Sequence, residues 1–153
     1  STIIKNLTFT SNGAKALSVT SGVCNLENCT FTECNASGNG AALVMDVTAK
    51  VTAKKCNFTS NKAANGAAVC LNSGTASSDD FVIFSAEDCV FQGNEATASG
   101  GAILIASNAK NGQVRFNNCR FDANKVSGTS SYGSVIFCNN FNICIFIISI
   151  TSC

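Results

Sequence analysis

Apolar and polar residues recur along this chain in one repeated run, apolar-x-apolar-x-x-Cys-x-Phe. The two-residue step between the apolar positions is the period of a β-strand, not of a helix. The two residues before each Cys break that step, which suits a bend or a bulge. The pattern therefore predicts short strands joined by a bend in every repeat. The apolar pairs that precede the Cys positions are Cys24/Leu26, Val51/Ala53, Phe84/Ala86 and Val114/Phe116.

Aligning the chain on its Phe residues extends this run into a longer repeat. Asn follows the Phe by three positions in four copies, and a Gly/Ala-rich step then opens a second apolar run, most fully at Gly100-Gly101-Ala102-Ile103. Leu7 takes the Cys position in the first copy. The repeated positions are Phe9, Phe31, Phe58, Phe91, Phe121 and Phe146; Cys29, Cys56, Cys89, Cys119 and Cys144; Asn12, Asn61, Asn94 and Asn124; and Gly100 and Gly101.

A repeat of about 22–33 residues with only short strands cannot bury its own apolar face, whereas stacked copies can. We therefore predict an all-β fold, a parallel β-helix of about six coils that forms one domain over residues 1–153. We expect this domain to be a segment of a longer or processed chain. The alternative is a β-sandwich, but a sandwich gives no reason for one motif to recur at the same phase.

The Phe, Cys and Asn positions predict three ladders that run along the stack. Cys and Phe are two residues apart and share a face, so both are expected inward, with the Cys residues mostly as buried reduced thiols. Asn tolerates the left-handed conformation and can end a strand, so the Asn positions are expected to turn the chain and to hydrogen-bond from coil to coil.

These motifs resemble the repeats of the chlamydial polymorphic outer-membrane proteins and of related β-helix surface proteins. The matching copies of Phe-x-x-Asn start at Phe9, Phe58, Phe91 and Phe121, and Gly100–Ile103 matches the Gly-Gly-Ala-Ile motif. The resemblance implies a right-handed parallel β-helix, exposure on a cell surface, and adhesion. The copies at Phe31 and Phe146 depart from it, since Cys34 and Ser149 stand where Asn is expected.

The second strands predict an apolar ridge on the outside of the stack. In Leu17-Ser18-Val19 the Ser faces outward, and carrying that phase along the stack places Val44, Cys70, Leu104 and Ile136 outside. Such a ridge is a candidate partner surface. The alternatives are that a loop covers it or that the strands are buried on both faces.

Two further candidate sites come from the end of the chain and from its sequons. Ile143, Ile145 and Ile147 form an apolar last coil onto which another coil or another copy could stack. Four Asn-x-Ser/Thr sequons are present, and Asn57 lies between inward Cys56 and Phe58, so it is expected outside, where it could carry a glycan.

Composition excludes several classes of function. With no His there is no Ser-His-Asp or Cys-His catalytic unit and no His metal ligand. A net charge of +1 and only two Arg give no electrostatic footprint for nucleic acid. The longest apolar stretch, Ile143–Ile150, is far shorter than the roughly 20 residues of a membrane-spanning helix. We therefore predict no catalytic residues, no cofactor, no metal site, no nucleic-acid partner and no membrane-spanning segment.

The sequence thus favours a non-enzymatic extracellular or cell-surface adhesion module, whose partner is a protein or glycan on a cell surface. One alternative is the subunit of an extracellular filament, in which the partners are further copies of the chain. The other is a polysaccharide lyase or hydrolase of the β-helix class. Such enzymes need carboxylates that converge on one face, whereas the nine acidic residues here are scattered.

Overall fold

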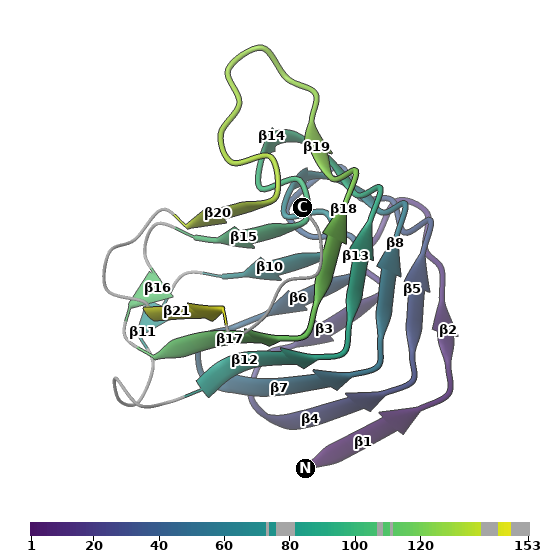
Figure 1. Ribbon diagram of the computed structural model, residues 1–153, viewed down its shortest axis with the longest axis vertical. Coiled ribbons are helices and arrows are strands. Elements are labelled where there is room, and N and C mark those ends of the chain that lie inside the picture. Colours follow the sequence, from purple (N-terminus) through teal and green to yellow (C-terminus); the bar gives the residue numbers. More distant parts are fainter. Residues whose placement is uncertain (73, 76–81, 107–108, 111, 139–143, 148–153) are drawn as a thin grey trace.

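The computed structural model describes residues 1–72, 74–75, 82–106, 109–110, 112–138 and 144–147. For residues 74–75, 109–110 and 144–147 it describes the backbone alone. Its described residues form parallel sheets stacked coil upon coil, as predicted (Figure 1). Coil 1 contains β1–β3, coil 2 β4–β6, coil 3 β7–β11, coil 4 β12–β16 and coil 5 β17–β20. The expected six coils are slightly too many, because after coil 5 the described residues contain only the strand β21.

Three large sheets and two small ones form the sides of the stack. Sheet 1 contains β1 (Thr2–Lys5), β4 (Gly22–Glu27), β7 (Ala49–Lys54), β12 (Val82–Glu87), β17 (Gln113–Asn117) and β21 (Cys144–Ile147). Sheet 2 contains β2 (Thr8–Phe9), β5 (Thr30–Thr32), β8 (Asn57–Thr59), β13 (Val90–Gln92) and β18 (Arg120–Asp122).

The remaining sheets close each coil. Sheet 3 contains β9 (Lys62–Asn65), β14 (Glu95–Ser99) and β19 (Lys125–Val126). Sheet 4 contains β3 (Leu17–Val19), β6 (Leu43–Met45), β10 (Val69–Leu71), β15 (Ile103–Ile105) and β20 (Ile136–Cys138). Sheet 5 contains only β11 (Gly74–Thr75) and β16 (Ala109–Lys110).

Left-handed residues turn the chain between these sheets, at three corners. The first corner, before the Cys positions, uses Asn6, Asn28, Lys55, Asp88 and Asn118, which confirms the predicted bend. The second corner, between sheets 2 and 3, uses Glu33, Ser60, Gly93 and Ala123. The third corner, before sheet 4, uses Gly40, Gly66, Gly100 and Gly133. At the second corner the left-handed residue is thus the one before the Asn position, not the Asn itself as we expected.

Stacked Phe rings form the centre of the core and confirm the predicted ladder over five coils. Neighbouring rings from Phe9 to Phe121 lie nearly parallel, with centroids 4.5–4.9 Å apart. Cys29, Cys56, Cys89 and Cys119 are buried beside them. Because aromatic stacking adds to the area that each ring buries, this column stabilises every interface between coils.

Phe146 and Cys144 do not continue these ladders, which corrects the alignment of the last repeat. In β21 Cys144 is in register with Gln113 and Phe146 with Arg115, so this segment extends sheet 1 and not sheet 2. The alignment failed because Cys-x-Phe recurs by chance within an apolar strand, where sequence spacing alone does not show which sheet a strand joins.

Asn12 is also off its predicted ladder. It bridges to Asn35, the residue after Cys34, and its side chain is exposed. Coil 1 has no left-handed residue at the second corner, so its chain is one position out of step with the other coils. The Asn ladder consists instead of Asn61, Asn94 and Asn124, which are buried, with Cys34 at the same position in coil 2.

Candidate functional site

The buried Asn residues form a continuous column of amides. The Asn94 Nδ2 donates to the Phe58 carbonyl at 2.9 Å and to the Asn124 Oδ1 at 2.8 Å. Its Oδ1 accepts from the Asn61 Nδ2 at 2.9 Å and from the Asn61 backbone N–H at 3.2 Å. Asn61 and Asn94 thus bond to the coils on both sides and Asn124 bonds to coil 4, which confirms the coil-to-coil bonding expected for these three residues.

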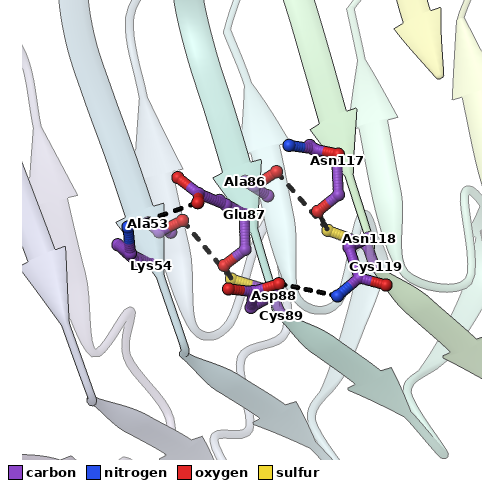
Figure 2. A network of polar contacts seen from close by, with 9 residues as sticks. All are labelled: Ala53, Lys54, Ala86, Glu87, Asp88, Cys89, Asn117, Asn118 and Cys119. Carbon is purple, nitrogen blue, oxygen red and sulfur yellow. Dashed lines mark hydrogen bonds and ion pairs between the residues drawn. The ribbon is translucent and has the colours of Figure 1, made fainter. Parts of the chain in front are cut away.

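The cysteine column, defined as Cys29, Cys56, Cys89 and Cys119, lies at the first corner and is the main group of chemically reactive side chains. Figure 2 shows two of its members with the carbonyls that they contact. The Cys89 thiol donates to the Glu87 carbonyl of its own coil at 3.3 Å and to the Ala53 carbonyl of coil 3 at 3.4 Å. The Cys119 thiol has the same two kinds of acceptor, at 3.4 and 3.5 Å. The thiols thus bond to carbonyls beside the left-handed turn.

Neighbouring thiols of the column also act on each other. Hydrogen bonding from Cys89 lowers the pKa of the Cys56 thiol to about 7, although burial opposes that shift. Hydrogen bonding with Cys119 and Cys56, together with burial, raises the pKa of Cys89. Hydrogen bonding from Cys89 likewise lowers the pKa of Cys119. The pKa values of neighbouring thiols in the column are therefore coupled from coil to coil.

Free buried thiols are what we expected of the Cys ladder, and the structure confirms them at Cys29, Cys56, Cys89 and Cys119. Cys24, Cys34 and Cys70 are also free and buried. Within the described part of the chain, no group of three or more His, Cys, Asp or Glu side chains is placed to hold a metal ion.

The predicted apolar ridge is a real row of residues, but it is not exposed. Val44, Cys70 and Leu104 are only 1%, 0% and 7% exposed and pack together as a small cluster outside the main core. A Cβ on Gly40 would lie 2.3 Å from the Val44 Cγ2, so the third corner packs directly on this row. The strands are therefore buried on both faces, and these residues offer no surface to a partner.

Ile136 does not belong to that row. It is in register with Ile103 and packs against the main core, whereas Phe137 is in register with Leu104. The assignment was one residue out because Gly133 takes the left-handed position of Gly100, so the counterpart of Ile103 is Ile136 and not Val135. Gly133 also packs against the Phe137 Cβ.

A shallow groove lies on the outer surface of sheet 3. Small side chains form much of its wall, and its lining residues are Asn35, Ala36, Ser37, Lys62, Ala63, Ala64, Glu95 and Thr97. The Glu95 carboxylate lies 3.9 Å from the Lys62 Nζ and 3.4 Å from the Lys125 Nζ. The Ser127 hydroxyl and both ammonium groups lower the pKa of Glu95, so this carboxylate is ionised.

A loop protrudes from the stack between β19 and β20 (Figure 1), and β19 pairs with β14, whose residues Glu95 and Thr97 line the groove. From Asn94 to Gly100 the chain advances six residues, but from Asn124 to Gly133 it advances nine. Tyr132 still bridges to Ser99, so the three extra residues lie before it, in the segment 129–131. Sequence reasoning missed this loop, although the longer spacing from Asn to Gly was the signal for it.

The acidic residues do not converge. Among the seven described carboxylates, Glu27, Glu87, Glu95 and Asp122 are in ion pairs with Lys or Arg. Asp46 and Asp88 accept hydrogen bonds from Asn72 and Asn118. We see no pair of carboxylates placed for acid and base work in the described residues. Asp79 and Asp80 lie outside them.

The remaining candidates have different outcomes. The Asn57 side chain is exposed on sheet 2, as expected, so a glycan there is sterically allowed. Ile143 and the side chains of Ile145 and Ile147 lie outside the described residues, so the predicted stacking end stays a prediction. No described residue belongs to a helix long and apolar enough to cross a membrane.

Stacked parallel sheets, left-handed corners and internal ladders define a β-helix. The family model described as a right-handed β-helix region matches residues 1–148, and the chain belongs to this family. No curated protein and no solved structure matches the chain. A β-helix fold does not by itself imply one activity, so the function of this chain has to be inferred from the sites that its fold carries.

Proposed function

We propose that this chain is a non-enzymatic binding module of a cell surface or extracellular assembly, and that it contacts its partner through the groove on sheet 3 and the loop 129–131. One observation carries the proposal. In coil 5 the connection from sheet 3 to sheet 4 is three residues longer than in coil 4, and this insertion lies beside the groove. Insertions into β-helical repeats map to loops on one face, which is often the binding face.

The chemistry of the groove fits a protein or glycan partner. Lys62, Glu95 and Lys125 present alternating charges, and Ser37 and Thr97 add hydroxyl groups. Small Ala side chains leave the sheet backbone close to the surface. Sugar hydroxyls and peptide groups can both bond to such a surface. The motifs shared with polymorphic outer-membrane proteins also support adhesion at a cell surface.

Two features support a binding role over hydrolysis of a polysaccharide. A retaining or inverting glycosidase needs two carboxyl groups facing one bond, one of them with a raised pKa. In the groove Glu95 is the one carboxylate, and its pKa is lowered. Detectable cleavage of polygalacturonate by the purified protein would overturn the proposal.

The direct test compares binding of labelled protein to glycan arrays and to intact animal cells. We expect saturable binding to at least one surface, and a tenfold or greater loss on deleting residues 129–131 or on Lys62→Glu. Lys50→Glu is the matched control, since it makes the same charge change on sheet 1. Equal loss in the control, or binding that both groove variants retain in full, would refute the assignment of this face.

A second candidate is a filament subunit, and the exposed edge of coil 1 favours it. The strands β1, β2 and β3 each end their sheet, and Ile3 and Leu7 are 63% and 52% exposed. Phe9 ends the Phe column at the same edge. Another coil from a second copy would continue the Phe column. Sedimentation that stays monomeric at high concentration, and is unchanged by Leu7→Lys, would exclude this role.

A further inference from the structure

The cysteine column places thiols that are far apart in sequence directly above one another. The backbone bonds on either side are in register: Asn57 N–H donates to the Cys29 carbonyl at 2.9 Å, and Val90 N–H donates to the Cys56 carbonyl at 3.0 Å. The Cys56 backbone N–H also reaches the Cys89 sulfur, at 3.4 Å. Successive thiols therefore project in parallel from coils stacked at the usual strand spacing of about 4.8 Å.

This geometry suits a bridging ion better than a disulfide. A disulfide needs a Cβ–S–S–Cβ dihedral of about 90°, whereas parallel side chains hold that angle near zero. With the Zn–S length of about 2.3 Å as a guide to metal–thiolate bonds, an ion in line between two thiolates needs the sulfurs about 4.6 Å apart. That separation is close to the coil spacing. The line from one sulfur through the ion to the next sulfur then runs parallel to the axis of the stack and at right angles to the side chains.

The ligand set selects the kind of metal. Each gap between coils offers two sulfurs, and the described residues contain no cluster of three or more metal-binding side chains. Zn²⁺ prefers four ligands, so a site with two is unsuited to it. Soft thiolate ligands select Cu(I) among the common transition metals.

We propose that the cysteine column binds Cu(I) in two-coordinate sites, each between the thiolates of neighbouring coils. Each ion forms two Cu–S bonds and displaces two thiol protons to solvent, and copper stays in the +1 state throughout. The resulting bis-thiolate site carries one negative charge. Backbone N–H donation of the kind seen from Cys56 to the Cys89 sulfur offsets part of that charge.

Leu7 is half-exposed and takes the column's position in coil 1, so Cys29 is the first thiol of the column. The proposal does not depend on the binding function suggested above.

The experiment titrates Cu(I) into the reduced full chain without oxygen, in competition with the chromophoric chelator bicinchoninate. We expect the wild type to retain about two ions per chain, because four thiols make two pairs. Cys89→Ala leaves the pair Cys29–Cys56 and isolates Cys119, so we expect about one ion. Cys70→Ala is the matched control, because Cys70 is equally buried but lies outside the column.

Circular dichroism checks that each variant is folded, and X-ray absorption at the copper edge of the wild type gives a readout that needs no variant. Two sulfur neighbours per copper are expected. Three or four sulfurs, no retention against the chelator, or equal copper loss in Cys70→Ala and Cys89→Ala would each overturn the proposal. Wild-type stoichiometry in a folded Cys89→Ala protein would overturn it too.

Discussion

The amide column (Asn61, Asn94 and Asn124) and the cysteine column lie at two corners of the same coils. Both provide hydrogen bonds to backbone carbonyls beside a turn, but with different chemical groups. Each follows a left-handed residue, and each bonds to carbonyls beside the turn. An amide has both donors and acceptors, so Asn94 bonds to coils 3 and 5 at once. A thiol is a weak donor that can also ionise. The amide column therefore fixes the stack, whereas the cysteine column contributes less and keeps its chemistry available.

Among the variants considered, Asn94→Ala is expected to lower the free energy of unfolding most, so it is the strongest test of the difference between the two columns. It removes two donated and two accepted hydrogen bonds and leaves buried groups of Phe58 and Asn61 without these partners, while the Asn124 Oδ1 keeps the backbone N–H of residue 94. We expect the free energy of unfolding to fall by about 3–5 kcal/mol in urea denaturation. The control is Asn65→Ala, which removes an exposed amide contact and is expected to cost less than about 1 kcal/mol. Similar losses in both variants would show that burial of the column is unimportant.

Alkaline pH ionises thiols but does not change the charge of amides, so it tests the contribution of the thiols alone. Burial raises the pKa of Cys70 to about 11, from a usual value of 9.0. Between these values the folded chain holds a proton that the unfolded chain releases, so stability falls as pH rises from 9 to 11. We expect Cys70→Val to remove up to about 2–3 kcal/mol of that loss, measured by denaturation at pH 8, 9.5 and 11. An unchanged pH slope in the variant would contradict this assignment.

Cys89→Ala measures the cysteine column directly. The variant loses thiol bonds at 3.3 and 3.4 Å and little volume. We expect about 1–2 kcal/mol of destabilisation, less than for Asn94→Ala. Its thiolate absorbance at 240 nm should also lose the component that titrates near pH 7, because Cys56 no longer has its donor. A cost equal to that of Asn94→Ala would make the two columns equivalent.

Cys34→Asn sharpens the comparison by placing an amide where coil 2 has a thiol. Cys34 occupies the ladder position, since its backbone N–H donates to the Asn61 Oδ1 at 3.0 Å and its thiol reaches the Phe9 carbonyl at 3.6 Å. An amide there would bond to the same carbonyl more strongly. We expect a gain of about 1 kcal/mol, read as a higher urea midpoint. A loss of similar size would show that coil 1 cannot accept the longer side chain.

The Phe and Cys ladders were predictable because they repeat a local pattern. Phe58 and Phe91 are 33 residues apart, yet each follows its own Cys by two positions in an otherwise similar strand. The predictions failed where the pattern was short or shifted. Phe146 follows Cys144 within a strand of sheet 1, and Asn12 lies in a coil that has no left-handed residue at the second corner.

Surface properties were harder to predict than the ladders. Alternation placed Val44, Cys70 and Leu104 on the side of sheet 4 away from the core, and this is correct. Alternation could not show that the glycine corner packs on that side and buries the row. The groove on sheet 3 was missed for a related reason, because its residues come from three coils and share no motif.

The sequence by itself determined the kind of fold, since a strand-period repeat that cannot bury its own apolar face must stack, and the right-handed β-helix family model matches residues 1–148. It also determined which residues form the internal columns of the central coils. Only the tertiary structure decided what those columns can do. Stacking brings residues about 30 positions apart to within one strand spacing, so Cys56 meets Cys89 and Asn61 meets Asn94. Contacts between coils depend on loop lengths and corner geometry, which a single repeat does not contain.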